Sequence, residues 1–293
     1  VEERPPPGRD LGFDDPIDED EDSPPVDTTT RVITAVVVAA LAIVCLYIGR
    51  GATTFLAALI VGIAAFEVYQ GFRHVGFKTA SALGILASVA LVIASYKRGE
   101  AAYPLITALF VLFTFLWYMV EVVKARAAVN IGMTLLGYAY VGVFGGFAGL
   151  LLAAPNGVGL ILGVAICAIG YDVVGYFVGK NFGRSKLAPR LSPNKTYEGL
   201  FAGMGASVVL GAIVSGVFDL TPWNEFGHGL ALGLVVAIIA PLGDLCESML
   251  KRDLQIKDFG SILPGHGGVL DRFDAILICL PAVYYLVRAL EIG

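Results

Sequence analysis

Charged residues are scarce in this chain. Only 15% of its 293 residues are charged, 57% are hydrophobic, and the mean hydropathy is +0.77. A soluble domain of this length carries about a quarter charged residues. A basic tract of the kind that binds nucleic acid is also missing. The composition therefore excludes an ordinary soluble domain or a nucleic-acid partner, and it predicts a polytopic membrane protein.

Cysteine and histidine are equally sparse. The four cysteines (Cys45, Cys167, Cys246 and Cys279) all lie inside or at the edge of apolar runs, without the spacing of a metal site. Cysteine in such surroundings behaves as a small buried apolar side chain. We therefore expect no zinc or thiolate centre.

The acidic residues are concentrated at one end. Residues 1–30 hold eleven Asp and Glu against two Arg, so the net charge of -5 becomes +4 without them. This proline-rich stretch has few large apolar side chains and cannot offset the entropy of ordering. We predict a disordered cytoplasmic tail over 1–30. A signal peptide would carry basic residues ahead of its apolar core, so we expect the next apolar run to be retained.

Long apolar runs fill the remainder. They predict an all-α integral membrane protein of about nine transmembrane helices, with an N-terminal scaffold over 31–154 and a C-terminal catalytic region over 155–293. The turn at Ala154–Gly157 predicts a tight helical hairpin. The runs cover 32–48, 53–70, 79–96, 103–122, 128–153, 157–179, 197–217, 227–250 and 270–290.

Basic residues indicate the orientation. With the N-terminus in the cytoplasm, fourteen Lys and Arg from Arg31 to Arg272 fall on the cytoplasmic side and four fall outside. The loops 180–196 and 251–270 then share the cytoplasmic face of a multi-pass protein of the cell membrane. Glu67 and Glu121 lie near cytoplasmic helix ends, where snorkelling explains an acid.

Polar residues occur mainly in the second half. Asp172 lies about two turns inside the membrane, where an acid needs a partner, a cation or water. Ser192 before Pro193 predicts a helix N-cap, with Glu198 in the first turns of that helix. Lys180 and Lys195 lie where a headgroup or a phosphate would be.

Two acidic pairs flank a charged glycine-rich loop. Asp244, Glu247 and Lys251 share one helix face, and Asp271 and Asp274 are spaced i, i+3 at the start of the last helix. Clustered carboxylates repel one another unless a cation lies between them, and oxygen ligands without a His or Cys set favour Mg²⁺.

The loop itself can bind anions. Its glycines permit a backbone nest for an anion, and basic side chains surround it. Cation, acids and basic groups around a glycine loop indicate phosphoryl or nucleotidyl transfer. These residues are Gly265, His266, Gly267, Gly268, Lys251, Arg252, Lys257 and Arg272.

The segment Ser248–Asp274 resembles the signature of the phosphatidate cytidylyltransferase family, also called CDP-diacylglycerol synthases. The positions that carry the resemblance are Ser248, Leu250, Lys251, Arg252, Lys257, Asp258, Gly260, Leu263 to Val269, and Asp271 to Asp274. Two upstream segments, 192–199 and 243–248, also resemble that family, as does Asp172 with its following Gly-Lys. The similarity covers about 170–290 closely.

The resemblance implies a Mg²⁺-dependent enzyme, with one or more metal ions, that converts CTP and phosphatidic acid into CDP-diacylglycerol and pyrophosphate. It also implies a homodimer among membrane lipids. By the resemblance, Asp244 and Asp271 are the leading metal ligands, with Glu247 and Asp274 in support. Ser192, Lys195, Glu198, Lys251 and Lys257 would meet substrate phosphates. We further expect Asp172 to face the cavity in support of the ligands.

Three alternatives remain open from sequence. A CDP-alcohol phosphotransferase would carry Asp-Gly-x2-Ala-Arg, which is missing here. A CTP-dependent lipid kinase would release CDP instead of pyrophosphate. A cation-coupled transporter using Asp172, Asp244 and Asp271 would show repeated halves with broken helices, and the sequence shows no such repeat.

Overall fold

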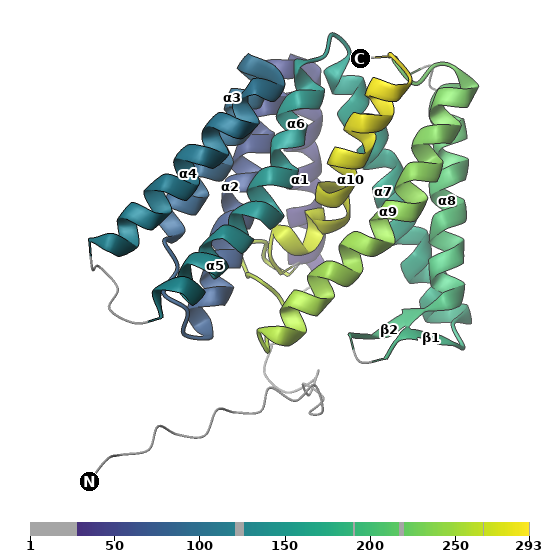
Figure 1. The fold of residues 1–293 in the computed structure, drawn as a ribbon. Coiled ribbons are helices and arrows are strands. Elements are labelled where there is room, and N and C mark those ends of the chain that lie inside the picture. Colours follow the sequence, from purple (N-terminus) through teal and green to yellow (C-terminus); the bar gives the residue numbers. More distant parts are fainter. Residues whose placement is uncertain (1–27, 121–125, 190, 217–219, 266, 293) are drawn as a thin grey trace.

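The computed structural model describes residues 28–120, 126–189, 191–216, 220–265 and 267–292 (Figure 1). The predicted acidic tail lies outside this part of the chain apart from its last three residues, which already belong to the first helix. Glu121 and His266 also lie outside it.

The first half is a set of helices packed around α2 and α3. Their apolar runs favour helix because a helix satisfies every backbone polar group within one segment. The elements are α1 (Thr28–Ile48), α2 (Arg50–His74), α3 (Ser81–Arg98), the short turn η1 (Gly99–Ala101), α4 (Ala102–Met119), α5 (Ala127–Gly137), the π-helical stretch η2 (Tyr138–Val143) and α6 (Phe144–Ala153).

The second half adds four long helices and a small hairpin of strands. α10 packs against α9 and also against α6 and α2, so it joins the two halves. The elements are α7 (Gly157–Phe182), β1 (Lys186–Ala188), β2 (Ser192–Thr196), α8 (Tyr197–Gly216), α9 (Phe226–Asp253) and α10 (Leu270–Ala289).

Within the described residues, each predicted apolar run corresponds to helix, and the hairpin at Ala154–Gly157 is confirmed, since α6 ends at Ala153 and α7 begins at Gly157. Among the described residues, seven continuous helical segments are long and apolar enough to cross a membrane. The number falls below nine for two reasons. The helices α3 and α4 run together through η1 as Ser81–Met119. The helix α10 begins with Asp271, Arg272 and Asp274, which make its start polar.

The helices α7 and α8 approach closely because glycine lines their contact. A Cβ built at Gly199 would lie 2.7 Å from the carbonyl oxygen of Gly175 and 3.0 Å from the Cα of Gly179. Small residues of this kind let membrane helices bring their backbones together. The contact sets the distance between Asp172 on α7 and the strand that leads into α8.

The prediction of a helix N-cap at Ser192 is wrong. Ser192 begins β2, which pairs antiparallel with β1 in the register Ala188 with Ser192 and Lys186 with Thr196. The helix begins four residues later than Ser-Pro suggests, and its cap is Thr196, whose Oγ1 accepts the N–H of Gly199 at 3.2 Å. Glu198 does lie in the first turn of α8, as predicted.

The chain between α9 and α10 turns back into the bundle. In Figure 1 this segment rises from the lower end of α9, and α10 begins inside the bundle rather than at that end. The hairpin of β1 and β2 lies at the same lower end. Both charged loops therefore share one face of the bundle, as the sequence predicts.

Candidate functional site

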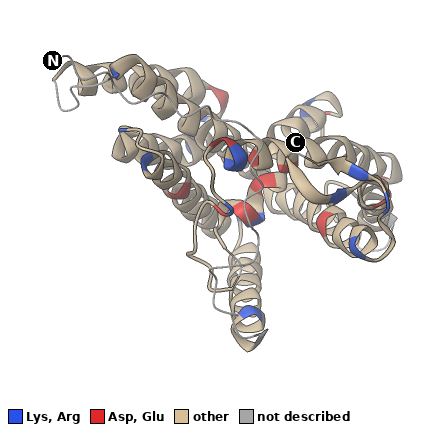
Figure 2. Ribbon diagram, turned by 90° about the horizontal axis from the view of Figure 1, so that it is seen from below, with Lys and Arg blue, Asp and Glu red and all other residues tan. Residues whose placement is uncertain are grey.

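A cavity of about 940 Å³ opens at the end of the bundle that carries the β1–β2 hairpin. It lies between α7, this hairpin, α8, α9 and the start of α10. Figure 2 shows acidic residues gathered near the centre of this end, with Lys and Arg beside them. The polar residues that line the cavity are Asp172, Lys180, Lys186, Ser192, Asn194, Lys195, Thr196, Asp244, Asp271, Arg272 and Asp274.

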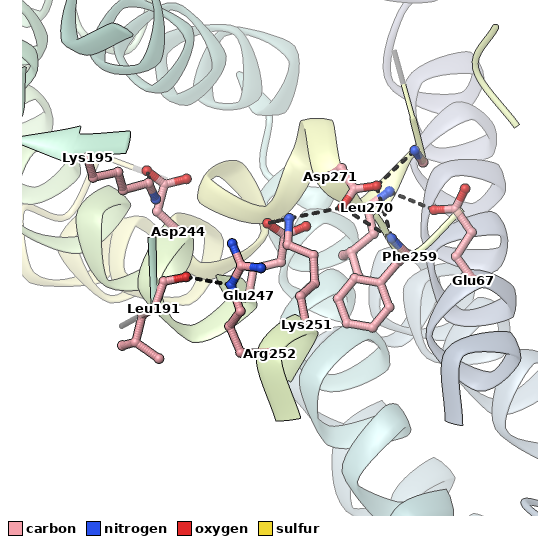
Figure 3. Close-up of polar contacts among 11 residues, drawn as sticks. Glu67, Leu191, Lys195, Asp244, Glu247, Lys251, Arg252, Phe259, Leu270 and Asp271 are labelled. Atoms are coloured by element: carbon pink, nitrogen blue, oxygen red, sulfur yellow. Dashed lines mark hydrogen bonds and ion pairs between the residues drawn. The ribbon is translucent and has the colours of Figure 1, made fainter. Parts of the chain in front are cut away.

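One wall of the cavity carries a Lys–Asp pair. The Nζ of Lys195, on β2, lies 2.8 Å from the Oδ2 of Asp244, on α9 (Figure 3). Their side chains remain 29% and 18% exposed, so both stay accessible from the cavity. The β1–β2 hairpin thereby places the ammonium group of Lys195 against the carboxylate of Asp244, which projects from α9.

Two further carboxyl groups, those of Asp172 and Asp274, line the cavity beside this pair. Asp172, Asp244 and Asp274 are close enough for the charge of each to affect the others. Asp274 is buried at 4% exposure. Close carboxyl groups in a poorly solvated site need a shared proton or a cation between them.

This donor set fits Mg²⁺ in its usual protein mode. Within the part of the chain that the structure describes, no three His, Cys, Asp or Glu side chains form a complete metal-holding group. Mg²⁺ commonly uses one or two carboxylates together with substrate phosphates and water. Adjacent carboxyl groups at Asp244 and Asp274, with Asp172 near, therefore suit a cation that arrives with a nucleotide.

Lys251 connects the other two acids of the predicted set. Its Nζ lies 2.7 Å from the Oε2 of Glu247 and 3.2 Å from the Oδ1 of Asp271 (Figure 3). Both carboxylates are nearly buried, with side-chain exposures of 5% and 3%. Lys251 thus stabilises a pair of acids that would otherwise repel each other.

Asp271 also organises the glycine-rich loop. Its Oδ2 accepts the N–H of Gly268 at 2.8 Å and that of Phe259 at 3.2 Å. Leu263 and Gly267 pair across the turn, and Gly265 and Gly267 adopt positive φ angles of 78° and 82°. The N–H of Gly268 is therefore directed at a carboxylate of the protein itself. Nearby, partial burial and the charge of Asp271 raise the pKa of Asp258.

Arg252 and Glu198 hold the hairpin in place. The Nε of Arg252 donates to the carbonyl oxygen of Leu191 at 3.0 Å, which ties the end of α9 to the turn between the strands (Figure 3). Glu198 accepts the N–H of Ser185 at 3.2 Å, ahead of β1. These two residues position the strand that carries Lys195.

The structure sorts the predicted residues into two groups. Asp172, Lys180, Ser192, Lys195, Asp244, Asp271, Arg272 and Asp274 line the cavity. The other predicted residues are not among those that line it and belong to α8, α9 and the loop: Glu198, Glu247, Lys251, Arg252, Lys257, Gly265, Gly267 and Gly268. Lys180 stacks its Nζ over the ring of Tyr176, 5.6 Å from the centroid.

Sequence reasoning missed Glu67. It is fully buried rather than snorkelling, and its carboxylate accepts the N–H groups of Val269 and Leu270 at 2.9 and 2.8 Å. The snorkelling interpretation is wrong because the loop turns back into the bundle and covers this position. The signal was an acid in an apolar helix with no basic residue three or four positions away.

The fold and the site together define a polytopic membrane protein with an acid-lined, lysine-bearing cavity at one end of its helix bundle. Residues 29–290 match the family model described as the Cytidylyltransferase family, and the chain belongs to this family.

Relatives agree with the family match. The chain is similar to the phosphatidate cytidylyltransferase of Bacillus subtilis (32% identity; 89% of this chain and 98% of that protein) and to that of Synechocystis (30%; 88% and 96%). A protein of the same name from Mycobacterium leprae is 43% identical over 47% of this chain and 44% of its own length.

Proposed function

We propose that this protein transfers the cytidylyl group of CTP to phosphatidic acid, giving CDP-diacylglycerol and pyrophosphate. The family membership supports this assignment. The observation that carries it is the Lys195–Asp244 pair beside the carboxyl groups of Asp172 and Asp274 in a cavity large enough for a nucleotide. A cation-coupled transporter would not need lysine and arginine in the same cavity.

The reaction needs positioning more than a strong base. The lipid phosphate is already anionic, so its oxygen attacks the α-phosphorus of CTP, the bond to the β-phosphate breaks, and pyrophosphate leaves with the electron pair. The obstacle is repulsion between two anions. Lys195, Lys180 and Arg272 line the cavity where phosphates would bind and lower that repulsion.

Mg²⁺ is part of the proposal. Asp244, Asp274 and Asp172 would hold it together with the predicted ligand Asp271, which also lines the cavity. The predicted ligand Glu247 does not line the cavity and would support the site through its pair with Lys251. A bound Mg²⁺ would neutralise phosphate charge and the developing charge on the leaving group. The chain contributes the alignment: α9 and α10 present the acids, and β2 presents Lys195 opposite them.

We further propose that the cavity faces the cytoplasm of the cell membrane and that two copies associate. The excess of basic residues on this face supports the orientation, and CTP is available there. The proposal of a dimer rests on the family resemblance. Measuring the molecular mass of the detergent-solubilised protein tests it.

The direct test uses purified protein in sealed vesicles with the hairpin face outward and phosphatidic acid in the bilayer. Adding CTP and Mg²⁺ outside should yield CDP-lipid and pyrophosphate in equal amounts, and chelating the metal should stop both. An Asp244→Asn variant should be inactive while eluting and melting as a folded protein. Absence of CDP-lipid from the unaltered protein would refute the assignment.

A further inference from the structure

Glu67 is the one residue of the scaffold half whose carboxylate, among the described contacts, reaches the loop that precedes α10. It lies two turns before the end of α2, and its side chain is fully buried. Burying a carboxylate is costly unless it receives hydrogen bonds. Glu67 receives two, both from backbone N–H groups more than 200 positions away in sequence.

These two donors form the start of α10. Val269 is the residue before the helix and Leu270 is its first residue. The first N–H groups of a helix have no partner within the helix, and a negative charge there is favoured by the helix dipole. Glu67 therefore caps α10 from another helix, with one carboxylate oxygen for each N–H. Figure 3 shows the contact with Leu270.

The surrounding glycines confirm how closely the carboxylate is enclosed. A Cβ built at Gly268 would lie 2.8 Å from the Oε2 of Glu67, and one built at Gly260 would collide with Oε1. Both glycines belong to the loop, so the loop can close over Glu67 only because these positions lack side chains.

We infer that Glu67 is a positioning residue for the proposed cytidylyl transfer: it holds the first turn of α10, and hence Asp271 and Asp274, at the distance from Asp244 that the reaction requires. The inference rests on the proposed function. Three consecutive backbone N–H groups at this turn donate to two carboxylates. The N–H of Gly268 donates to Asp271, and the N–H groups of the next two residues donate to Glu67. Releasing one of them frees the turn to shift.

Two substitutions separate hydrogen bonding from packing. Glu67→Gln keeps the shape of the side chain but presents an NH2 group to one of the two N–H donors. Glu67→Asp loses one methylene group but keeps two acceptor oxygens. If Glu67 acts through its hydrogen bonds, the unaltered protein should be the most active, Glu67→Asp less active and Glu67→Gln the least active. If Glu67 acts only through packing, Glu67→Gln should be at least as active as Glu67→Asp.

Kinetics give the second readout. Lys195, Lys180 and Ser192 lie on α7 and β2, away from Glu67, so substrate binding should be preserved. We expect Glu67→Gln to lower kcat by about ten- to hundredfold, because small misplacements of reacting groups cost rates of this size. KM for CTP should stay within about twofold.

Glu100→Gln is the matched control. Glu100 is also a carboxylate of the scaffold half that binds α10, but at the opposite end, where it pairs with Arg288 at 3.2 Å and accepts the hydroxyl of Tyr284. Its substitution can lower thermal stability but should leave kcat within about twofold. Equal kcat losses in the two Gln variants would overturn the inference.

Hydrogen exchange tests the contact without any activity. Peptides that cover residues 259–272 should lose protection in Glu67→Gln and keep it in Glu100→Gln, because only the first loses an acceptor there. Unchanged protection in Glu67→Gln, or unchanged kcat, would overturn the inference. An unaltered protein that makes no CDP-lipid would instead refute the proposed function, while the exchange result would still decide whether Glu67 holds the turn.

Discussion

At the scale of single residues, the site depends on charges that compensate one another. Lys195 faces Asp244, and Lys251 faces Glu247 and Asp271. The first pair lines the cavity, whereas Lys251 and Glu247 do not. We therefore expect Lys195 to exchange its contact with Asp244 for substrate phosphate, and Lys251 to stay with its acids.

Lys195→Met tests this division. Loss of a hydrogen bond between charged partners costs about 1.5–3 kcal/mol, so kcat/KM for CTP should fall roughly ten- to hundredfold. Steady-state assays with varied CTP measure the effect. Lys97→Met, in the last turn of α3 at the opposite end of the bundle, is the control and should behave as the unaltered protein. An unchanged kcat/KM in Lys195→Met would show that the lysine does not meet the nucleotide.

Residue-scale prediction from sequence succeeded where partners are close along the chain. Asp244, Glu247 and Lys251 could be placed on one face because helical spacing alone does so. It failed for Glu67, whose partners Val269 and Leu270 are brought to it only by the turn of the loop back into the bundle. Periodicity carries no information about such a contact.

At the scale of elements, helices were predictable and strands were not. A long apolar run can cross a membrane only as a helix or as part of a closed barrel, which is why each predicted run corresponds to helix in the part of the chain that the structure describes. The hairpin is different. Ser192-Pro193 is compatible with a helix start, and only the pairing with Lys186–Ala188 makes it a strand.

The contact between α7 and α8 supplies a prediction at this scale. Gly199→Ala should destabilise the protein by about 1–3 kcal/mol, because its Cβ would overlap the backbone of α7. The same change at Gly205, also on α8, meets nothing within 4 Å and should stabilise the helix by up to about 1 kcal/mol.

Thermal unfolding in one detergent, followed for both variants, measures the difference. Gly199→Ala should also lower activity, since Gly199 borders the cavity. Equal melting temperatures for the two alanine variants would contradict the close approach of α7 and α8.

At the scale of the whole molecule, the two halves work as one unit. The segments that resemble the cytidylyltransferase signature lie in the second half, yet the family match spans 29–290. The structure gives a physical reason: α10 packs against α6 and α2, and Glu67 of α2 caps it. The first half is therefore more than a membrane anchor, which its hydrophobic pattern alone could not predict.

The proposed reaction breaks the bond between the α- and β-phosphates of CTP. The most direct measurement follows two labels, one in the α-phosphate and one in the γ-phosphate of CTP, in vesicles that contain phosphatidic acid and the purified protein. Cytidylyl transfer should carry the α label into the lipid and release the γ label as pyrophosphate. Transfer of the γ label to the lipid, with release of CDP, would contradict it and identify a lipid kinase.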